Sequence, residues 1–399
     1  MENDWLGKWT EDIDQLELEL PQRHKNLFFR LEKKDFYEQI QNLKKDLVNL
    51  DNYMIYARIM AIVASIRDAH TTVTMSVAKV IPFEFYWFSE GIYLVDTFGE
   101  NNDALNCRVT YLNGIPIDEV IQRLTSIVSC ENKSFLRAQL PKYLPAVELL
   151  YGLEIIDEFE DVEITFELQN GIAFTETVTT CEYSNLKRKI IKDVGVSQDY
   201  LPLYRKNKSK NFWSFFIEEH NTLYFKYNSC RDMQDTTVED FCVDLLHFIN
   251  QEEVKKLVID LRNNLGGDST LLDPFIEELS KCKILNREGS IFVILGRETF
   301  SSALLNAYSL KNGTKAIFVG EATGGKPNCY GEVLYFDLKN SKLRIRYSTE
   351  YYKIIKDDKQ LSFFPEVNFE VTIKDYLDKR DPCMDYILSG TRGQVHCPR

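Results

Sequence analysis

Two adjacent serines, Ser301 and Ser302, stand between an apolar run and a helical pattern. The run SIFVIL before them has the composition of a buried strand, and ALLNAYS after them is typical of a helix. A serine at such a junction can cap the helix, because its oxygen accepts hydrogen bonds from the first free N–H groups. It can also be a nucleophile at the positive end of the helix dipole. The local pattern allows both interpretations.

A second segment, VIDLRNNLGG (258–267), joins a buried strand to polar residues and two glycines. In a parallel sheet, ligands bind at the carboxyl ends of the strands. Gly266 and Gly267 could bring bare backbone N–H groups close to a ligand and stabilise an oxyanion there. The alternative is a turn that needs positive φ, in which Asp260 and Arg262 form a structural ion pair.

His70 is a candidate general base. It is one of five histidines and lies in the polar turn RDAHTTV (67–73). Histidine is the commonest general base in enzymes. Asp68 could orient the imidazole, or it could simply form the turn, and His70 could likewise be structural.

Lys326 is a second candidate base. Its segment GEATGGKPN (320–328) nearly matches a phosphate-binding loop. Pro327 stands where that loop needs Ser or Thr, and the segment that follows is typical of a strand rather than a helix, so a nucleotide site is rejected. A buried lysine can still act as a base near neutral pH, whereas an ordinary surface lysine cannot.

The composition limits the remaining classes of function. With 399 residues, 44% of them hydrophobic and 27% charged, the chain is expected to form two or three globular domains. A net charge of -13 argues against nucleic acid and anionic membranes as partners. No apolar stretch is long enough for a membrane span, and no signal peptide is recognisable in the sequence as given. Nine scattered cysteines predict reduced thiols and a cytoplasmic protein, and no His or Cys pair has zinc-site spacing, so no metal is expected.

The elements that must position the candidate residues suggest three parts. Residues 1–78 are predicted to be helical, and Asp51 is expected to cap one of the helices. Residues 79–205 have the short strands and turns of a small α/β module. Residues 206–399 alternate strand and helix, which predicts parallel strands joined by helical crossovers. One face of the second predicted helix carries Phe36, Ile40, Leu43, Leu47 and Leu50.

The order of these motifs resembles a known family. DLRNNLGG, then TFSSA and then GEATGGK, each after a strand, are similar to segments of the tail-specific (C-terminal processing) serine peptidases, which are related to tricorn core protease and interphotoreceptor retinoid-binding protein. RDAHT and FFPEVNFEV (363–371) resemble further segments of the family. The resemblance is most specific over residues 220–390. It implies an α/β fold with a Clp protease/crotonase-like core, and a middle module that is PDZ-like or a degenerate PDZ domain.

The resemblance also implies roles for the site residues. Ser301 matches the nucleophile, and Ser302 is the alternative one position later. The Ser302 N–H, with Gly266 or Gly267, would form the oxyanion hole. Asp68, Asp260 and Arg262 would be structural or would position the substrate.

Two bases are compatible with the resemblance. Tail-specific members use a Ser–Lys dyad, and Lys326 occupies the matching position. Tricorn-like members use a histidine, which His70 matches. His70 is slightly preferred, with Lys326 then helping to bind substrate.

The sequence therefore predicts a serine peptidase that cleaves peptides or unstructured polypeptides through an acyl-enzyme on Ser301. No cofactor is expected, the expected partner is a peptide or protein substrate, and the oligomeric state stays open. One alternative is a non-catalytic protein that binds an apolar ligand or a peptide on the same core. Another is an esterase or amidase that acts on small molecules by the same acyl chemistry.

Overall fold

A computed structural model describes residues 4–98, 102–186 and 200–389. These residues form two compact units. The first takes in the described residues of Met1–Glu131, Leu136–Val196 and Cys329–Tyr352, and the second those of Asn132–Phe135, Ser197–Asn328 and Lys353–Arg399. The predicted part 206–399 thus contains a segment, Cys329–Tyr352, that packs into the first unit. The three-part division at residues 78 and 205 stays a prediction.

The first unit begins with the predicted helices. They are α1 (Trp5–Arg23), α2 (Lys33–Asp46), the short 3₁₀ helix η1 (Leu47–Asn49) and α3 (Asn52–Ala64). Asp51 caps α3 as expected, because its side chain accepts hydrogen bonds from the N–H groups of Tyr53 and Met54. Phe36, Ile40 and Leu43 form the buried face of α2. The α-helix ends at Asp46, so this periodic face does not continue as α-helix to Leu50, contrary to the prediction.

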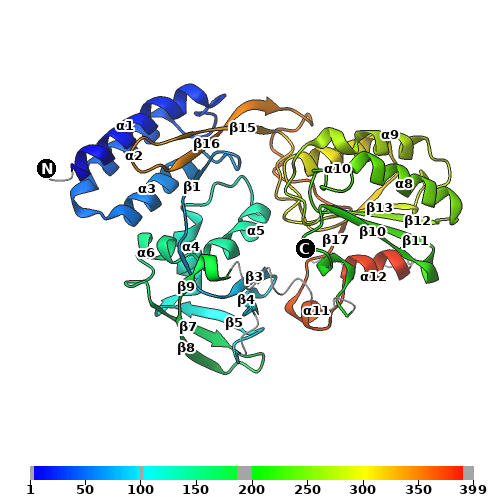
Figure 1. Ribbon diagram of the computed structural model, residues 1–399, viewed down its shortest axis with the longest axis horizontal. Coiled ribbons are helices and arrows are strands. Elements are labelled where there is room, and N and C mark those ends of the chain that lie inside the picture. The colour runs from blue at the N-terminus through cyan, green and yellow to red at the C-terminus, as the bar shows by residue number, and fades with distance from the viewer. Residues whose placement is uncertain (1–3, 99–101, 187–199, 390–399) are drawn as a thin grey trace. The chain divides into compact units, whose positions relative to one another are not determined.

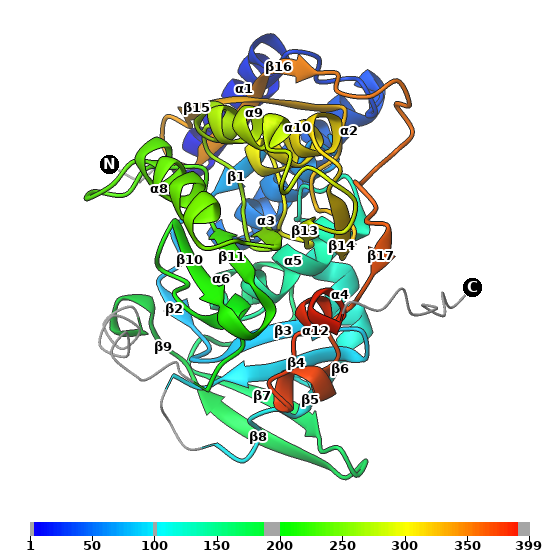
Figure 2. The same cartoon turned by 90° about the vertical axis from the view of Figure 1, so that its right-hand side faces the viewer.

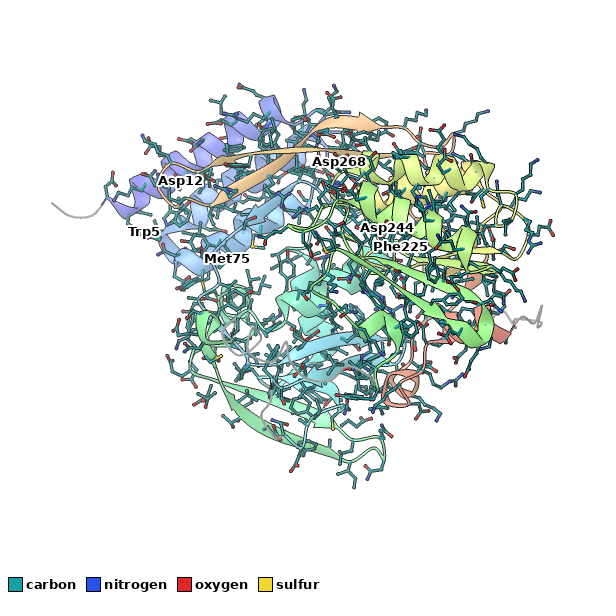
Figure 3. The ribbon with its side chains drawn as sticks, turned by 45° about the vertical axis from the view of Figure 1, so that its right-hand side comes forward. Trp5, Asp12, Met75, Phe225, Asp244 and Asp268 are labelled. Carbon is teal, nitrogen blue, oxygen red and sulfur yellow. The ribbon has the colours of Figure 1, made fainter. Side chains whose placement is uncertain are left out.

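A three-stranded sheet joins distant parts of the chain within the first unit. Its strands are β1 (Thr72–Thr74), β15 (Cys329–Asp337) and β16 (Arg344–Tyr352), in the order β1-β16-β15. The turn between β15 and β16 is held by the buried Asp12 of α1, which Figure 3 labels. Its carboxylate accepts the backbone N–H groups of Asn340 and Ser341, both at 2.7 Å. The hairpin is therefore an integral part of the first unit.

The predicted α/β module is an antiparallel sheet with helices. The strands are β3 (Glu84–Phe88), β4 (Gly91–Asp96), β5 (Arg108–Leu112), β6 (Ile115–Pro116), β7 (Asp161–Glu167) and β8 (Ala173–Thr179), and β2 (Lys79–Val80) pairs separately with β9 (Cys181–Glu182). The helices are α4 (Ile117–Thr125), α5 (Lys133–Tyr143) and α6 (Val147–Gly152). The main order is β3-β4-β5-β7-β8, and Figure 2 shows β8 at its outer edge. The PDZ-like character of this module stays a prediction.

The second unit has the predicted alternation of strand and helix. Its sheet contains β10 (Phe212–Ile217), β11 (Thr222–Tyr227), β12 (Lys256–Asp260), β13 (Ile291–Leu295), β14 (Ile317–Gly320) and β17 (Val367–Asn368), in that order. All neighbours are parallel except β10 and β11. The helices are η3 (Leu203–Arg205), η4 (Glu218–His220), α8 (Val238–Gln251), η5 (Ser269–Leu272), α9 (Asp273–Lys281), α10 (Ser302–Gly313), α11 (Ile373–Leu377) and α12 (Pro382–Ser389).

Both faces of this sheet are buried. Figure 1 shows α8, α9 and α10 on one face and α12 on the other. Phe225 of β11, labelled in Figure 3, packs with residues of the first group of helices, and Val258 of β12 packs with Ile387 of α12. Burial on both faces explains why these strands are unbroken apolar runs in the sequence. Among the residues described, no helix combines the length and hydrophobicity that a membrane span requires.

Candidate active site

Ser301 lies at the junction between β13 and α10 in an unusual backbone conformation, with φ 52° and ψ −126°. It is the N-cap residue of α10, yet its side chain makes no capping hydrogen bond. The capping interpretation is therefore wrong for this serine. A non-glycine residue at positive φ costs about 1–3 kcal/mol and is retained where the surrounding structure imposes it. The turn holds Ser301 partly exposed at the N-terminus of a helix.

Ser302 is placed differently from its neighbour. Its side chain is buried, and its hydroxyl donates a hydrogen bond to the carbonyl oxygen of Gly267, with Oγ 2.6 Å from O. The Ser301 hydroxyl has no hydrogen bond within the described part of the chain. Of the two serines, only Ser301 therefore presents an unengaged hydroxyl.

The glycine pair lies directly against this turn. A Cβ atom on Gly266 would stand 2.9 Å from Cβ of Ser301 and 3.0 Å from the Ser302 nitrogen, and Gly266 has φ 105°. A Cβ atom on Gly267, at φ 142°, would stand 2.2 Å from the carbonyl oxygen of Cys230. Both positions thus require glycine, for space and for backbone conformation.

The backbone N–H groups of the pair are not equivalent. Gly266 is buried, and its N–H donates to Oδ1 of Asn264 at 2.9 Å. Gly267 is exposed, and its N–H has no acceptor among the described residues. The Ser302 N–H, at the first position of α10, also has no acceptor among the described residues, and Ser302 is buried. The two residues joined by the hydrogen bond from Ser302 to Gly267 therefore each keep an unengaged backbone N–H.

Lys326 belongs to the same unit as Ser301 and follows β14. It is buried, with 6% of its surface exposed, so the interpretation as an ordinary surface lysine is wrong. Its loop packs on the serine turn, because the Gly325 N–H donates to the Thr299 carbonyl at 3.0 Å. A Cβ atom on Gly325 would lie 3.3 Å from Cα of Phe300. The segment that follows forms β15, a strand as predicted, and not the helix that a phosphate-binding loop requires.

His70 belongs to the first unit and lies just before β1. Burial lowers the pKa of its imidazole, and the neighbouring charge of Asp68 opposes this effect. Oδ1 of Asp68 lies 3.9 Å from Nδ1 of the ring and accepts the backbone N–H of His70 at 3.1 Å. Asp68 is thus both a turn former and the carboxylate beside the ring.

Asp68 is buried in a polar network that the sequence did not reveal. Its Oδ2 lies 3.0 Å from Nε2 of His24 and accepts the hydroxyls of Thr71 and Ser348 at 2.6 and 2.7 Å. Burial raises the pKa of Asp68, but the hydrogen bond from His24 and the charge of His70 outweigh it and bring the pKa to about 2. Nδ1 of His24 accepts the N–H of Asn26, which assigns the proton to Nε2.

Asp260 and Arg262 lie in a buried ionic cluster of the second unit. Asp260 accepts hydrogen bonds from Nζ of Lys226 and Nε of Arg262, each at 3.0 Å, and from the hydroxyl of Tyr224 at 2.6 Å. The guanidinium of Arg262 forms a bidentate pair with Asp381, at 3.1 and 2.9 Å. Burial lowers the pKa of Lys226 to about 8, although the charge of Asp260 opposes it. The cluster joins β11, the end of β12 and the start of α12.

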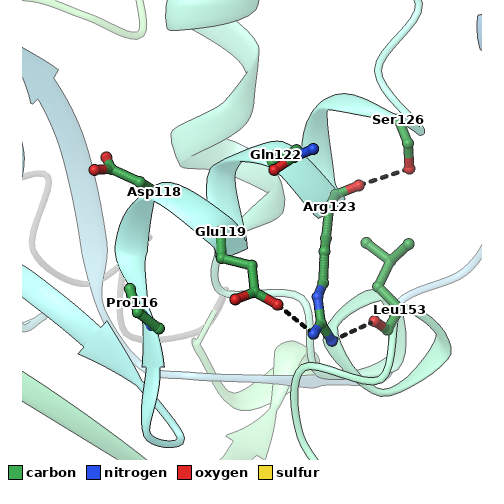
Figure 4. A pocket seen from close by; sticks show the side chains of 7 residues that line it. All are labelled: Pro116, Asp118, Glu119, Gln122, Arg123, Ser126 and Leu153. Carbon is green, nitrogen blue, oxygen red and sulfur yellow. Dashed lines mark hydrogen bonds and ion pairs between the residues drawn. The ribbon is translucent and has the colours of Figure 1, made fainter.

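A surface hollow of about 710 Å³ lies on α4 of the first unit. Figure 4 shows that Arg123 crosses it, bonded to Glu119 and to the carbonyl of Leu153. None of the predicted site residues lines this hollow. Within residues 4–98, 102–186 and 200–389, no group of three or more His, Cys, Asp or Glu side chains is arranged to hold a metal ion.

Comparison with known proteins gives matches to solved structures alone. No protein-family model and no curated protein matches the sequence. Solved structures do match. The structure of mature CPAF complexed with lactacystin has a TM-score of 0.67 at 13% identity, over 96% of this chain and 97% of that chain. The crystal structure of mature CPAF has a TM-score of 0.65 at 13% identity, over 98% and 99% of the two chains.

A likeness at this level of identity shows the fold. The predicted α/β class is therefore confirmed. Over nearly its whole length, this chain adopts the fold of mature CPAF.

Proposed function

We propose that this chain is a serine peptidase that cleaves peptides or unstructured polypeptides through an acyl-enzyme on Ser301. One observation carries the proposal. A serine with an unengaged hydroxyl is held at positive φ at the N-terminus of α10, beside two backbone N–H groups without acceptors among the described residues. A nucleophile next to preorganised donors is the arrangement that acyl transfer requires.

The chemistry follows from these positions. Oγ of Ser301 attacks the carbonyl carbon of the scissile bond while a general base takes its proton. The N–H groups of Ser302 and Gly267 donate hydrogen bonds to the carbonyl oxygen as negative charge develops on it, and the α10 dipole stabilises the same charge. The tetrahedral intermediate collapses, the amine leaves with the proton from the base, and water then hydrolyses the ester by the same steps.

Two residues remain candidates for the base. His70 has the Asp68 carboxylate beside its ring, which favours a role in which the carboxylate stabilises an imidazolium. Lys326 is buried and its loop packs on the turn that carries Ser301. We prefer His70 as the base, with Lys326 as a substrate-binding group, and the two belong to different units.

The compartment and the partners are also proposals. All eight cysteines within the described residues are free thiols, which supports a reducing compartment such as the cytoplasm. Peptides or unstructured polypeptides would be the substrates.

Labelling with a fluorophosphonate probe tests the nucleophile. Wild-type protein should gain one adduct, mapped by mass spectrometry to Ser301, and Ser301→Ala should gain none. Ser309→Ala, in the same helix, is the matched control and should label like the wild type. The proposal fails if the folded wild type takes no label and cleaves neither peptides nor esters.

Further assays on the same proteins distinguish the two candidate bases and the classes of substrate. His70→Ala and Lys326→Ala are compared for labelling rate, and the variant that loses labelling while folded identifies the base. Cleavage of peptides as well as small esters supports the peptidase, whereas ester cleavage alone supports the esterase or amidase. A wild type that binds peptide or apolar ligands without any acylation would support the non-catalytic alternative.

A further inference from the structure

Asn264 makes hydrogen bonds to both segments that carry the proposed oxyanion donors, the glycine pair and the turn before α10. It is fully buried, and its Oδ1 accepts the Gly266 N–H at 2.9 Å. Its Nδ2 donates to the carbonyl of Tyr227 at 3.0 Å, at the end of β11. Its own carbonyl accepts the N–H of Phe300 at 3.0 Å, one residue before Ser301. A single side chain and its backbone therefore tie the glycine pair to the strand beneath it and to the nucleophile turn.

The thiol of Cys230 and the side-chain amide of Asn306 also contact the glycine loop, which is the segment from Asn264 to Ser269. Sγ of Cys230 lies 3.6 Å from Oδ1 of Asn264 and 3.5 Å from Oδ1 of Asn306. The backbone of Cys230 also clamps the loop, because its N–H donates to the Gly266 carbonyl at 3.1 Å and its carbonyl accepts the Asp268 N–H at 2.8 Å. The proposed peptidase chemistry uses none of these side chains.

Asn306 links the end of the glycine loop to α10. It lies on α10, is fully buried, and donates from Nδ2 to the carbonyl of Ser269 at 2.8 Å. The glycine loop is thus bonded to the helix whose first N–H belongs to Ser302. A shift of the loop relative to α10 would break these bonds.

This arrangement selects one glycine as the donor. The Gly266 N–H is buried and taken by Asn264, whereas the Gly267 N–H is exposed and has no acceptor among the described residues. We propose that Asn264 is a positioning residue of the oxyanion hole, which fixes the Gly266 peptide so that Gly267 and Ser302 supply the two donors. This inference rests on the proposed function, in which Ser301 is the nucleophile.

The role has a specific kinetic consequence. Asn264 is fully buried, so we expect its loss to leave substrate binding intact and to weaken only the interaction with the developing oxyanion. Loss of one oxyanion donor costs about 10²–10³-fold in kcat. Asn264→Ala removes the constraint on the donor rather than the donor itself, so we expect kcat to fall about 10- to 100-fold with KM changed less than about 2-fold.

A pair of esters tests this directly. The substrates are a p-nitrophenyl ester and the thionoester in which sulfur replaces the carbonyl oxygen. Sulfur accepts hydrogen bonds poorly, so the oxyanion hole contributes less to thionoester cleavage. In Asn264→Ala the oxoester should slow far more than the thionoester, and the ratio of their rates should fall. Asn250→Ala is the control, because Asn250 is exposed and its side chain donates to the carbonyl of Leu246 in its own helix α8; it should keep both rates within about 2-fold of the wild type.

The outcomes separate this proposal from the function on which it rests. An Asn264→Ala protein that folds but slows both esters equally, or changes only KM, would overturn the positioning role. If Asn264→Ala does not fold, Cys230→Ala decides, because it removes the thiol that contacts Oδ1 of Asn264 and of Asn306 and leaves both asparagines in place. It should lower the ratio less strongly, and an unchanged ratio would overturn the proposal. A folded wild type that takes no fluorophosphonate label and turns over neither ester would overturn the peptidase function itself, and the positioning role with it.

Discussion

The hydroxyl of Ser302 donates a 2.6 Å hydrogen bond to the carbonyl oxygen of Gly267. Because of this contact, the hydroxyls of the two adjacent serines have different roles. Ser302 is committed to the glycine loop, and Ser301 is left with an unengaged hydroxyl within the described residues. The bond also holds the Gly267 peptide close to the start of α10, where the proposed oxyanion donors lie.

Ser302→Ala should lower stability without removing the nucleophile. We expect it to lower the free energy of unfolding by about 1 kcal/mol, because one buried hydrogen bond is lost and the Gly267 carbonyl is left without this donor. Fluorophosphonate labelling should persist, slowed less than about tenfold, since the nucleophile and both N–H groups remain. Urea unfolding and labelling rates measure the two effects. Complete loss of label in a folded Ser302→Ala protein, with label retained in Ser301→Ala, would reverse the assignment.

The labelling rate should depend on pH in a way that identifies the base. A general base acts in its deprotonated form, so the rate falls as pH falls through its pKa. Burial lowers the pKa of His70 from its ordinary value of 6.5, so with His70 as base the midpoint lies below 6.5 and the rate is flat above it. Asp68→Asn should move the midpoint lower still, because the Asp68 charge raises this pKa. A labelling rate that persists in His70→Ala and is lost in a folded Lys326→Ala would indicate Lys326 instead.

The buried ion pair between Arg262 and Asp381 should contribute more to stability than the exposed ion pair between Arg380 and Asp385. Both side chains of the pair are less than a tenth exposed, so Asp381→Ala leaves a buried guanidinium with one carboxylate fewer. We expect a loss of about 3 kcal/mol in unfolding free energy, measured by urea denaturation. Asp385→Ala, which removes the exposed partner of Arg380, is the control and should not change the midpoint measurably. Equal effects of the two substitutions would contradict the structural role of the cluster.

Gly266→Ala should damage both stability and acylation. Its Cβ atom would collide with Cβ of Ser301 at a φ of 105°, and so displace the nucleophile turn. We expect labelling to fall by about 100-fold or more, on the scale of a lost oxyanion donor. Gly171→Ala is the control, because Gly171 also has positive φ, at 83°, but a Cβ atom there would meet nothing within 4 Å. It should cost about 1 kcal/mol of stability and leave labelling unchanged.

Local signals in the sequence were sufficient for strands β11 to β14 of the second unit and for the α-helices between them. Strands buried on both faces appear as unbroken apolar runs, and their alternation with amphipathic segments predicts a parallel sheet with crossovers. The antiparallel pairing of β10 with β11 was not predicted. The glycine pair after Asp260 was recognisable because only glycine tolerates positive φ with backbone at van der Waals distance on one side. The end of α2 at Asp46 was not recognisable, since the apolar residues Leu47 and Leu50 continue the periodic pattern beyond the helix.

The sequence by itself determined which residue types stand at the carboxyl ends of strands, and hence Ser301, Gly266, Gly267 and Lys326 as candidates. Only the tertiary structure decided which groups are engaged. The side chain of Asn264 accepts the Gly266 N–H. The hydroxyl of Ser302 donates to the carbonyl of Gly267, which lies 35 positions earlier in the chain. Asp68 is bound by His24 and by Ser348, which are 44 and 280 positions away. Hydrogen bonds between residues so distant leave no periodic pattern in a sequence, because they depend on the packing that brings the elements together.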